Sequence, residues 1–350
     1  MNDEGKHRKF DVVIGNPPYQ DESIGGNTKA PSIYHLFISD SYKIANIVEL
    51  IHPARFLFNA GDTPKKWNRK MLNSNHLKVM YFTQDASKVF SNTDIKGGIA
   101  VTYFNKQKKF TPIKTFSIYP EINDILQKVL NRDFKSLSDI VYSPVAYKFT
   151  SKMHSDYPNL KAKLSKGNEF EVKTNVFDTI PEVFFDKKPN DGSEYVKILG
   201  RTNGKTREKK YIKRDYIFNK TNLDYYKVAL PEANGKGTLG ETLSTPQILR
   251  PQEGHTQTFL TIGCFDTENE AIAAKKYIST KFARTMLDTL KITQHNSIST
   301  WKNVPLQDFT DKSDIDWTKS IPEIDQQLYK KYNLSDDEIA FIEKNVKEMK

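Results

Sequence analysis

Apolar positions in the first hundred residues alternate between strand-like and helix-like spacing. Short apolar or β-branched runs of strand length occur at four places: 10–14, 46–51, 77–82 and 99–104. Between them, residues 33–42 and 65–72 carry apolar side chains at helical spacing. The last two strands predict a hairpin at a sheet edge. The whole order predicts an α/β fold, the back half of a doubly wound sheet.

After about residue 106 the pattern changes to short strands, turns and aromatic residues, followed by helices. Residues 121–130 predict a connecting helix. Thr267 and Glu270 predict a capping box that opens a helix reaching Leu290. A helix over 321–332 and another capped by Ser335 follow. We therefore predict four segments: an α/β part over 1–112, a connecting segment over 113–145, a mixed α+β domain over 146–310 and C-terminal helices over 311–350.

The first strand is a short β-branched run of the kind that forms a buried parallel strand, and it leads directly into the turn Asn16-Pro17-Pro18-Tyr19. Two prolines in series forbid helix and further ladder pairing, so the chain leaves the sheet in an extended shape. The amide oxygen of Asn16 and the carbonyl oxygen of Pro17 can then converge at the carboxyl end of the strand, where open α/β sheets bind ligands. Two acceptors suit an exocyclic amine, and Tyr19 offers a flat ring beside it. The alternative is an ordinary strand-to-turn junction.

These features resemble the methylase domain of Eco57I-like restriction–modification enzymes, over about residues 8–106. The resemblance rests on four segments: FDVVIGNPPYQ, IYHLFI, HPARFL and NTDIKGG. It implies an incomplete doubly wound, Rossmann-like methyltransferase sheet, with S-adenosylmethionine as the cofactor and adenine N6 in DNA as the methyl acceptor. It also implies that residues 146–310 form a target recognition domain, as in these methylases and in type I specificity subunits.

The same resemblance assigns roles to residues of the turn and to one further aromatic. The catalytic residues would be Asn16, Pro17, Pro18 and Tyr19. Asn16 and Pro17 would accept hydrogen bonds from N6 of a flipped adenine, and they would also border the cofactor. Tyr19 would stack on one face of the base and Phe90 on the other. The alternative for Phe90 is a core side chain under a loop.

A methyltransferase also needs a glycine-rich turn for S-adenosylmethionine, and the pattern does not provide one. The usual order places it before the first strand, yet only nine residues precede Phe10. The segment Gly235–Gly240 fits G-x-G-x-x-G, but Pro246 follows too soon for a helix, so we expect a flexible loop. We therefore expect a truncated chain, a late-starting reading frame or half of a split enzyme. Its partners would be the missing N-terminal methyltransferase segment or a restriction subunit.

The charge of the chain favours double-stranded DNA as a partner. It contains 53 Lys and Arg against 43 Asp and Glu, a net charge of +10. Eleven basic and four acidic residues lie between 187 and 220, interleaved with tyrosines, a composition that fits phosphate contacts. The predicted contacts are Lys205, Arg207, Lys209 and Lys210. The alternative is a solvated face of a basic protein.

A polar loop after the helix at 268–290 is a second candidate DNA contact. Its side chains would read base edges or touch phosphates, or they would cap their own backbone instead. The loop residues in question are Gln294, His295, Asn296 and Ser297.

Several other functions are disfavoured. The single cysteine, Cys264, excludes an internal disulfide and a cysteine-based zinc site. His255 and His295 have no neighbouring ligands in the sequence, so we expect no metal. No apolar run approaches the length of a membrane span and no signal peptide is visible, so we expect a cytoplasmic protein without a membrane partner. The nuclease-like spacing of Asp156, Glu171 and Lys173 is common in a lysine-rich chain.

The sequence therefore predicts a DNA adenine-N6 methyltransferase of a restriction–modification system. The alternative is a sequence-specific DNA-binding module, or a split-enzyme half, without independent catalysis. A cytosine-N4 enzyme stays open because the same two acceptors could hold that amine. A protein or RNA methyltransferase is weakened by the basic second region but not excluded.

Overall fold

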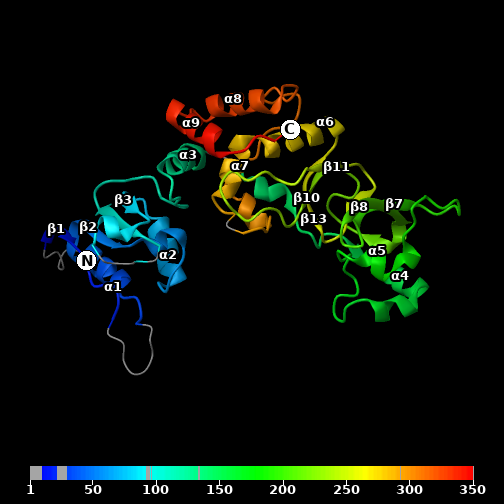
Figure 1. Ribbon diagram of the computed structural model, residues 1–350, viewed down its shortest axis with the longest axis horizontal. Coiled ribbons are helices and arrows are strands. Elements are labelled where there is room, and N and C mark those ends of the chain that lie inside the picture. Colours follow the sequence, from blue (N-terminus) through cyan, green and yellow to red (C-terminus); the bar gives the residue numbers. More distant parts are fainter. Residues whose placement is uncertain are drawn as a thin grey trace, which may run out of the picture. The chain divides into compact units, whose positions relative to one another are not determined.

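The computed structural model describes residues 10–21, 30–91, 95, 97–132, 135–291 and 293–349. The chain forms two compact units, which meet between Gln127 and Lys128. Both combine helices with small sheets, so the predicted mixed α/β class is confirmed (Figure 1). The boundary lies within the predicted connecting segment, whereas the segment borders at 112, 145 and 310 stay predictions. Within the described residues, no helix has the length and apolar character needed to cross a membrane.

Unit 1 is built on a four-stranded sheet with the order β1-β2-β4-β3. Its strands are β1 (Phe10–Gly15), β2 (Ala45–Pro53), β3 (Leu77–Thr83) and β4 (Ile99–Asn105). β1 and β2 are parallel, whereas β4 pairs antiparallel with both β2 and β3. The predicted strands and the predicted edge hairpin of β3 and β4 are thereby confirmed.

The helices of unit 1 connect these strands and cover one face of the sheet. They are α1 (Tyr34–Ile44), the 3-10 helix η2 (Ala54–Phe58), α2 (Lys65–Leu72) and the 3-10 helix η3 (Ala86–Lys88). Ile38 of α1, Val48 of β2, Phe56 of η2 and Leu72 of α2 are buried in one cluster. Burial of this shared apolar face stabilises the unit.

The position of β1 differs from the sequence prediction of a buried strand. Within the described ranges, β1 pairs with β2 alone and forms the edge of the sheet. Phe10, Val12 and Ile14 expose 54%, 46% and 75% of their surface, while Val13 packs against the core. Parallel strands are ordinarily covered on both faces. In the part of the chain that the structure describes, this apolar face of β1 is exposed.

Unit 2 contains three separate sheets. The largest has the order β11-β10-β13-β5, the second β12-β7-β8 and the smallest β6-β9. The first consists of β5 (Val141–Tyr142), β10 (Tyr226–Pro231), β11 (Gln247–Leu249) and β13 (Phe259–Phe265). The others consist of β6 (Lys148–Phe149), β7 (Tyr195–Thr202), β8 (Thr206–Lys213), β9 (Ile217–Phe218) and β12 (Glu253–His255).

Helix α3 (Pro120–Leu130) contains the boundary between the units, and the remaining helices belong to unit 2. The α-helices are α4 (Ser151–Asp156), α5 (Val176–Thr179), α6 (Glu268–Ser279), α7 (Lys281–Asp288), α8 (Ile321–Lys331) and α9 (Asp336–Asn345). The 3-10 helices are η4 (Leu137–Ile140), η5 (Pro158–Lys163), η6 (Pro181–Val183), η7 (Arg214–Tyr216) and η8 (Ile298–Trp301). Capping boxes open α8 and α9, and the predicted cap at Ser335 is confirmed.

The single helix expected from Glu268 to Leu290 is interrupted at Thr280, so that prediction is wrong in part. Thr280 is extended and is the N-cap of α7, because its side chain accepts a hydrogen bond from the amide of Ala283. The buried carboxylate of Asp325 accepts from the amides of Lys281 and Phe282, both at 2.9 Å. These bonds satisfy amides that a helix start leaves unpaired, so the break costs little.

Two fully buried histidines, His52 in β2 and His255 in β12, are held as neutral rings. The Nδ1 atoms lie 3.1 Å and 2.9 Å from the carbonyl oxygens of Pro53 and Thr256. Because a carbonyl only accepts, Nδ1 carries the proton in each ring. Burial lowers the pKa of each imidazole to about 4.

We expect acid to destabilise both units through these histidines. Unfolded histidine titrates near pH ~6.5, so between about pH 6.5 and 4 the unfolded chain binds more protons and the free energy of unfolding falls as the pH falls. Each ring should account for about 2 kcal/mol between pH 7 and 4.5. Urea unfolding at the two pH values measures this, with His52→Gln and His255→Gln flattening the change. An unchanged pH dependence in both variants would contradict the assignment.

Candidate functional site

The predicted catalytic turn lies where two parallel strands end. Asn16 follows β1 directly, and Pro53 ends β2 at the same side of the sheet because the strands are parallel. The chain then returns toward α1, since the amide of Ile33 donates to the carbonyl of Tyr19 at 3.1 Å. This geometry brings the turn, the start of α1 and the end of β2 together.

A cavity of about 290 Å³ opens at this place. Its lining combines aromatic, polar and charged side chains from the turn, α1, β2 and the segment after η2: Tyr19, Gln20, Ser32, Tyr34, Pro53, Arg55, Gly61, Asp62 and Ile95. Among the four predicted turn residues, Tyr19 reaches the cavity. Asn16 and Pro18 are exposed beside it, and Pro17 is half-buried. The cavity is thus bordered by the turn and closed by aromatic rings.

Tyr19 is fixed by packing and keeps a neutral hydroxyl. Its ring packs against the core cluster of unit 1. The hydroxyl is buried, and among the described residues it forms no hydrogen bond of good geometry, although the Asn16 side chain lies close enough to affect its titration. Burial raises the pKa of Tyr19, an effect that Asn16 partly offsets. The phenol is therefore protonated at neutral pH.

Tyr34 forms a rigid wall of the cavity. Its ring stacks on His52 with 5.7 Å between the centroids and an interplanar angle of 8°. The indole of Trp67 meets it edge-on at 6.4 Å. Burial raises the pKa of Tyr34 to about 12. The Tyr34 hydroxyl is therefore protonated at neutral pH.

Phe90, the second aromatic predicted to face the base, follows η3 and is partly buried. Its amide donates to the carbonyl of Ala86 at 2.9 Å. The described residues that line the cavity do not include it. Its stacking role stays a prediction.

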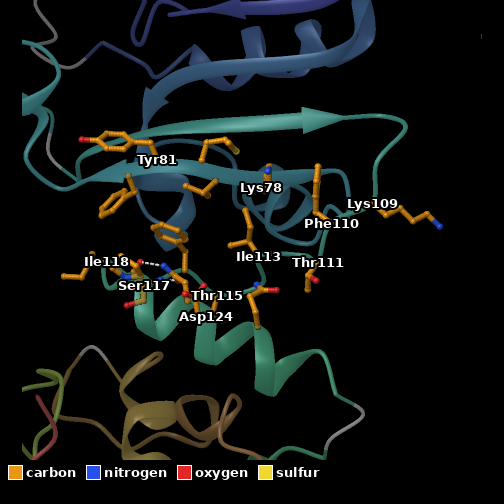
Figure 2. A pocket seen from close by; sticks show the side chains of 17 residues that line it. Lys78, Tyr81, Lys109, Phe110, Thr111, Ile113, Thr115, Ser117, Ile118 and Asp124 are labelled. Carbon is orange, nitrogen blue, oxygen red and sulfur yellow. Dashed lines mark hydrogen bonds between the residues drawn. The ribbon is translucent and has the colours of Figure 1, made fainter. Parts of the chain in front are cut away.

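A larger cavity of about 600 Å³ lies at the opposite edge of the same sheet, beside β3 (Figure 2). Tyr81 and Lys78 of β3, Phe110 and Ile113 of the following segment, and Asp124 of α3 line it. It contains none of the predicted catalytic residues. Because β1 and β3 form opposite edges of the sheet, the two cavities are separate.

The predicted phosphate-binding residues differ in how free their charges are. Lys205 is exposed in the β7–β8 turn. The Nζ atom of Lys209 lies 2.6 Å from a Glu253 oxygen, and that of Lys210 lies 3.1 Å from Asp186. Arg207 lies over the ring of Phe259, with 5.7 Å from the guanidinium carbon to the centroid. Two of the four charges are thus partly neutralised within the fold.

In the polar loop, one residue serves the fold and three are exposed. Asn296 is 1% exposed, and its Nδ2 donates to the carbonyl of Pro231 at 3.0 Å. Asn296 therefore does not have the predicted role of a DNA contact, because its hydrogen bond anchors the loop to the end of β10. His295 pairs through Nδ1 with the Glu232 carboxylate at 2.9 Å. Gln294 and Ser297 are exposed.

The glycine-rich segment Gly235–Gly240 is a loop, as expected, and it encloses an internal carboxylate. The amides of Lys236 and Gly237 donate to a Glu241 oxygen at 2.8 and 3.0 Å. A Cβ atom at Gly235 would lie 2.1 Å from the same carboxylate. The backbone amides that this loop could offer to a cofactor are taken up by the Glu241 side chain.

The described residues do not bring together the side chains of the nuclease-like spacing or a set of metal ligands. Asp156 is bound by Lys152 at 2.6 Å and by the Tyr216 hydroxyl at 2.7 Å. Glu171 accepts instead from Gln257 at 2.7 Å. Over the part of the chain that the structure describes, no three His, Cys, Asp or Glu residues are arranged to hold a metal ion.

Tyr19 could be predicted from the sequence, whereas no role was predicted for Tyr34, Pro53 or Arg55, which line the same cavity. The available signal was the segment HPARFL itself. It places a proline and a cation at the carboxyl end of a strand, where a parallel sheet binds ligands.

Comparison with known proteins gives one family match. Residues 1–90 match the family model of the Eco57I restriction-modification methylase. An "uncharacterized adenine-specific methylase" of Mycoplasma pneumoniae is 30% identical over 105 residues, which are 29% of this chain and 24% of that protein. The resemblance predicted from the sequence is confirmed for this part. The chain spans about a quarter of the length of that curated relative.

Two solved structures show a distant similarity. The type IIG restriction endonuclease BpuSI has 11% identity and a TM-score of 0.29, with 92% of this chain and 49% of that chain covered. The type IIL restriction-modification enzyme MmeI, solved in complex with DNA, has 10% identity and a TM-score of 0.30, with 96% and 56% covered. TM-scores of this size do not establish a common fold.

Proposed function

We propose that this chain is the target-binding part of a DNA adenine-N6 methyltransferase of a restriction–modification system. The observation that carries the proposal is the cavity at Tyr19, whose lining residues all belong to the region that matches the methylase family except Ile95. In this proposal unit 1 is the incomplete Rossmann-like methyltransferase sheet, and unit 2 contains the target recognition domain. The substrate is an adenine flipped out of double-stranded DNA.

The chain's own residues would hold the amine and the ring. The side-chain oxygen of Asn16 and the carbonyl of Pro17 would accept the two N–H bonds of N6. This favours a pyramidal nitrogen whose lone pair points away from the ring, so the gain comes from positioning and electrostatics. The Tyr19 ring is already immobilised by packing, so stacking a base on it costs little further side-chain entropy.

S-adenosylmethionine would supply the methyl group, but the described residues do not form a site for it. The glycine-rich loop is filled by Glu241. Among the described residues, no strand pairs with the outer edge of β1, next to the proposed catalytic turn. In this proposal, further protein at this edge completes the enzyme.

A second candidate, half of a split enzyme, is favoured by the exposed face of β1. Three apolar side chains on one face of an edge strand are a liability for a chain that acts alone. In this candidate, a second polypeptide that carries a cofactor-binding methyltransferase segment pairs with β1 and covers this face. A restriction subunit is the other expected partner.

The first test is transfer of labelled methyl from S-adenosylmethionine to mixed-sequence DNA by the 350-residue chain, with DNA binding measured in parallel. Transfer would mean that the chain completes a cofactor site itself. DNA binding without transfer would support the split-enzyme candidate. If the chain showed no methyl transfer and no DNA binding, both candidates would be contradicted.

The identity of the methyl acceptor is tested on the product. Nucleoside analysis separates N6-methyladenine from N4-methylcytosine, and RNA and protein acceptors test the other methyltransferase classes.

The hairpin of β7 and β8, which contains Lys205, Arg207, Lys209 and Lys210, gives a further prediction. Because Lys209 and Lys210 are paired with carboxylates, Lys205 and Arg207 should contribute most to phosphate binding. The double variant Lys205→Gln/Arg207→Gln should reduce the slope of log affinity against log salt by roughly 2. Lys344→Gln, an exposed change on α9, is the control. An unchanged slope would show that this hairpin is a solvated face.

A further inference from the structure

Arg55 occupies a channel that two glycines leave open for its side chain. A Cβ atom at Gly61 would lie 3.1 Å from the Cβ of Arg55. A Cβ atom at Gly97 would lie 2.7 Å from its Cγ. Both glycines have positive φ, at 83° and 91°, which other residues rarely adopt. The aliphatic stem of Arg55 is therefore confined, and its charged end has a restricted position.

The positive charge of Arg55 lies near the Tyr19 cavity. Arg55 lines that cavity together with Tyr19 and Tyr34. Although burial raises the pKa of Tyr34, the positive charge of Arg55 lowers it, which places the charge near the Tyr34 side of the cavity. The channel thus directs a cation to the place where a ligand would enter.

Within the described residues, this cation has no partner in the protein. Arg55 makes no ion pair there and no side-chain hydrogen bond, although Asp62 also lines the cavity. By contrast, the buried Arg284 donates to the carbonyls of Ser279 and Glu241 at 3.2 and 3.1 Å. An anion from outside would give this guanidinium the charged hydrogen-bond partner that the described residues do not supply.

We infer that Arg55 binds the phosphate of the nucleotide whose base enters the Tyr19 cavity. The inference rests on the proposed function, because it takes the base in the cavity as given. A guanidinium presents several N–H donors in a plane and matches phosphate oxygens in a bidentate manner. A nucleotide that leaves the duplex carries its own phosphate to the mouth of the cavity. Arg55 is thus a positioning residue that fixes the depth and orientation of the base.

Mononucleotides test this without knowledge of the DNA sequence recognised. The probes are adenosine and adenosine 5′-monophosphate, titrated into the full chain and followed by NMR. The monophosphate should bind wild type about tenfold more tightly than adenosine, as expected for hydrogen bonds between charged groups. Arg55→Gln should remove this difference and leave adenosine binding unchanged. Arg55→Lys should retain only part of it because the fork geometry is lost.

Arg69→Gln is the matched control, because Arg69 lies exposed on α2 and its Nε bonds only to a backbone carbonyl, that of Lys65 at 3.4 Å. It should keep the full preference for the monophosphate. Unchanged adenosine binding and unchanged thermal unfolding show that Arg55→Gln is folded. Equal binding of the two probes by wild type, or a preference that survives in Arg55→Gln, would overturn the inference while the adenine cavity stands. If wild type bound neither probe, the adenine cavity itself and the inference would both be wrong.

Discussion

Asn16→Ala should abolish methyl transfer by the complete enzyme and leave its DNA affinity nearly unchanged. The proposal makes the Asn16 side chain one of two acceptors for the amine that is methylated. Removing one preorganised polar group that acts on the reacting atom costs about 100-fold or more in turnover. Single-turnover methylation with equal amounts of bound DNA would measure this loss. Turnover like that of wild type would contradict the catalytic assignment of the turn.

The structure makes this variant readily interpretable. Asn16 is exposed at the end of β1, so truncation removes no core packing. Its side chain influences Tyr19, whose ring is held by the core rather than by Asn16. Asn73→Ala is a suitable control, since Asn73 is equally exposed and its Nδ2 bonds only to the carbonyl of Arg69 at 2.8 Å. The control should retain full transfer and full stability.

The strands of unit 1 could be predicted because their spacing reports side-chain burial directly. The same logic mispredicted β1. Phe10, Val12 and Ile14 form a run suited to burial on both faces, but a sequence pattern does not say which protein supplies the cover. The exposed face of β1 is thus information that only the sheet order reveals.

Features that depend on distant residues could not be predicted. The break between α6 and α7 is stabilised by Asp325, which reaches the amides of Lys281 and Phe282 from another helix. Likewise, Lys209 of β8 forms an ion pair with Glu253 of β12, and β7 lies between these two strands. Its charge is therefore less free than the local composition suggests. In the candidate site the turn was found because its local chemistry is distinctive. Arg55 was missed because its meaning depends on Gly61 and Gly97.

Gly98→Ala should destabilise unit 1 by about 3 kcal/mol or more. Gly98 has a φ of 80°, and a Cβ atom there would lie 2.2 Å from the carbonyl oxygen of Thr83 and 2.8 Å from the Cα of Gln84. Both obstacles are backbone, so β3 and β4 would have to separate. The carbonyl of Gly98 also accepts the amide of Ala54 at 2.9 Å, which links this hairpin to the start of η2.

Gly204→Ala separates the clash from the backbone effect. Gly204 lies in the β7–β8 turn with a φ of 66°, but a Cβ atom there meets nothing within 4 Å. That variant should lose only about 1 kcal/mol, the ordinary cost of a left-handed residue with a side chain. Urea unfolding gives both free energies, and hydrogen exchange assigns each loss to its unit. Because Ala54 precedes Arg55, Gly98→Ala should also loosen the guanidinium channel. Equal losses of unfolding free energy in the two variants would show that the β3–β4 junction relaxes around the new methyl group. The position of Arg55 would then depend on Gly61 and Gly97 alone.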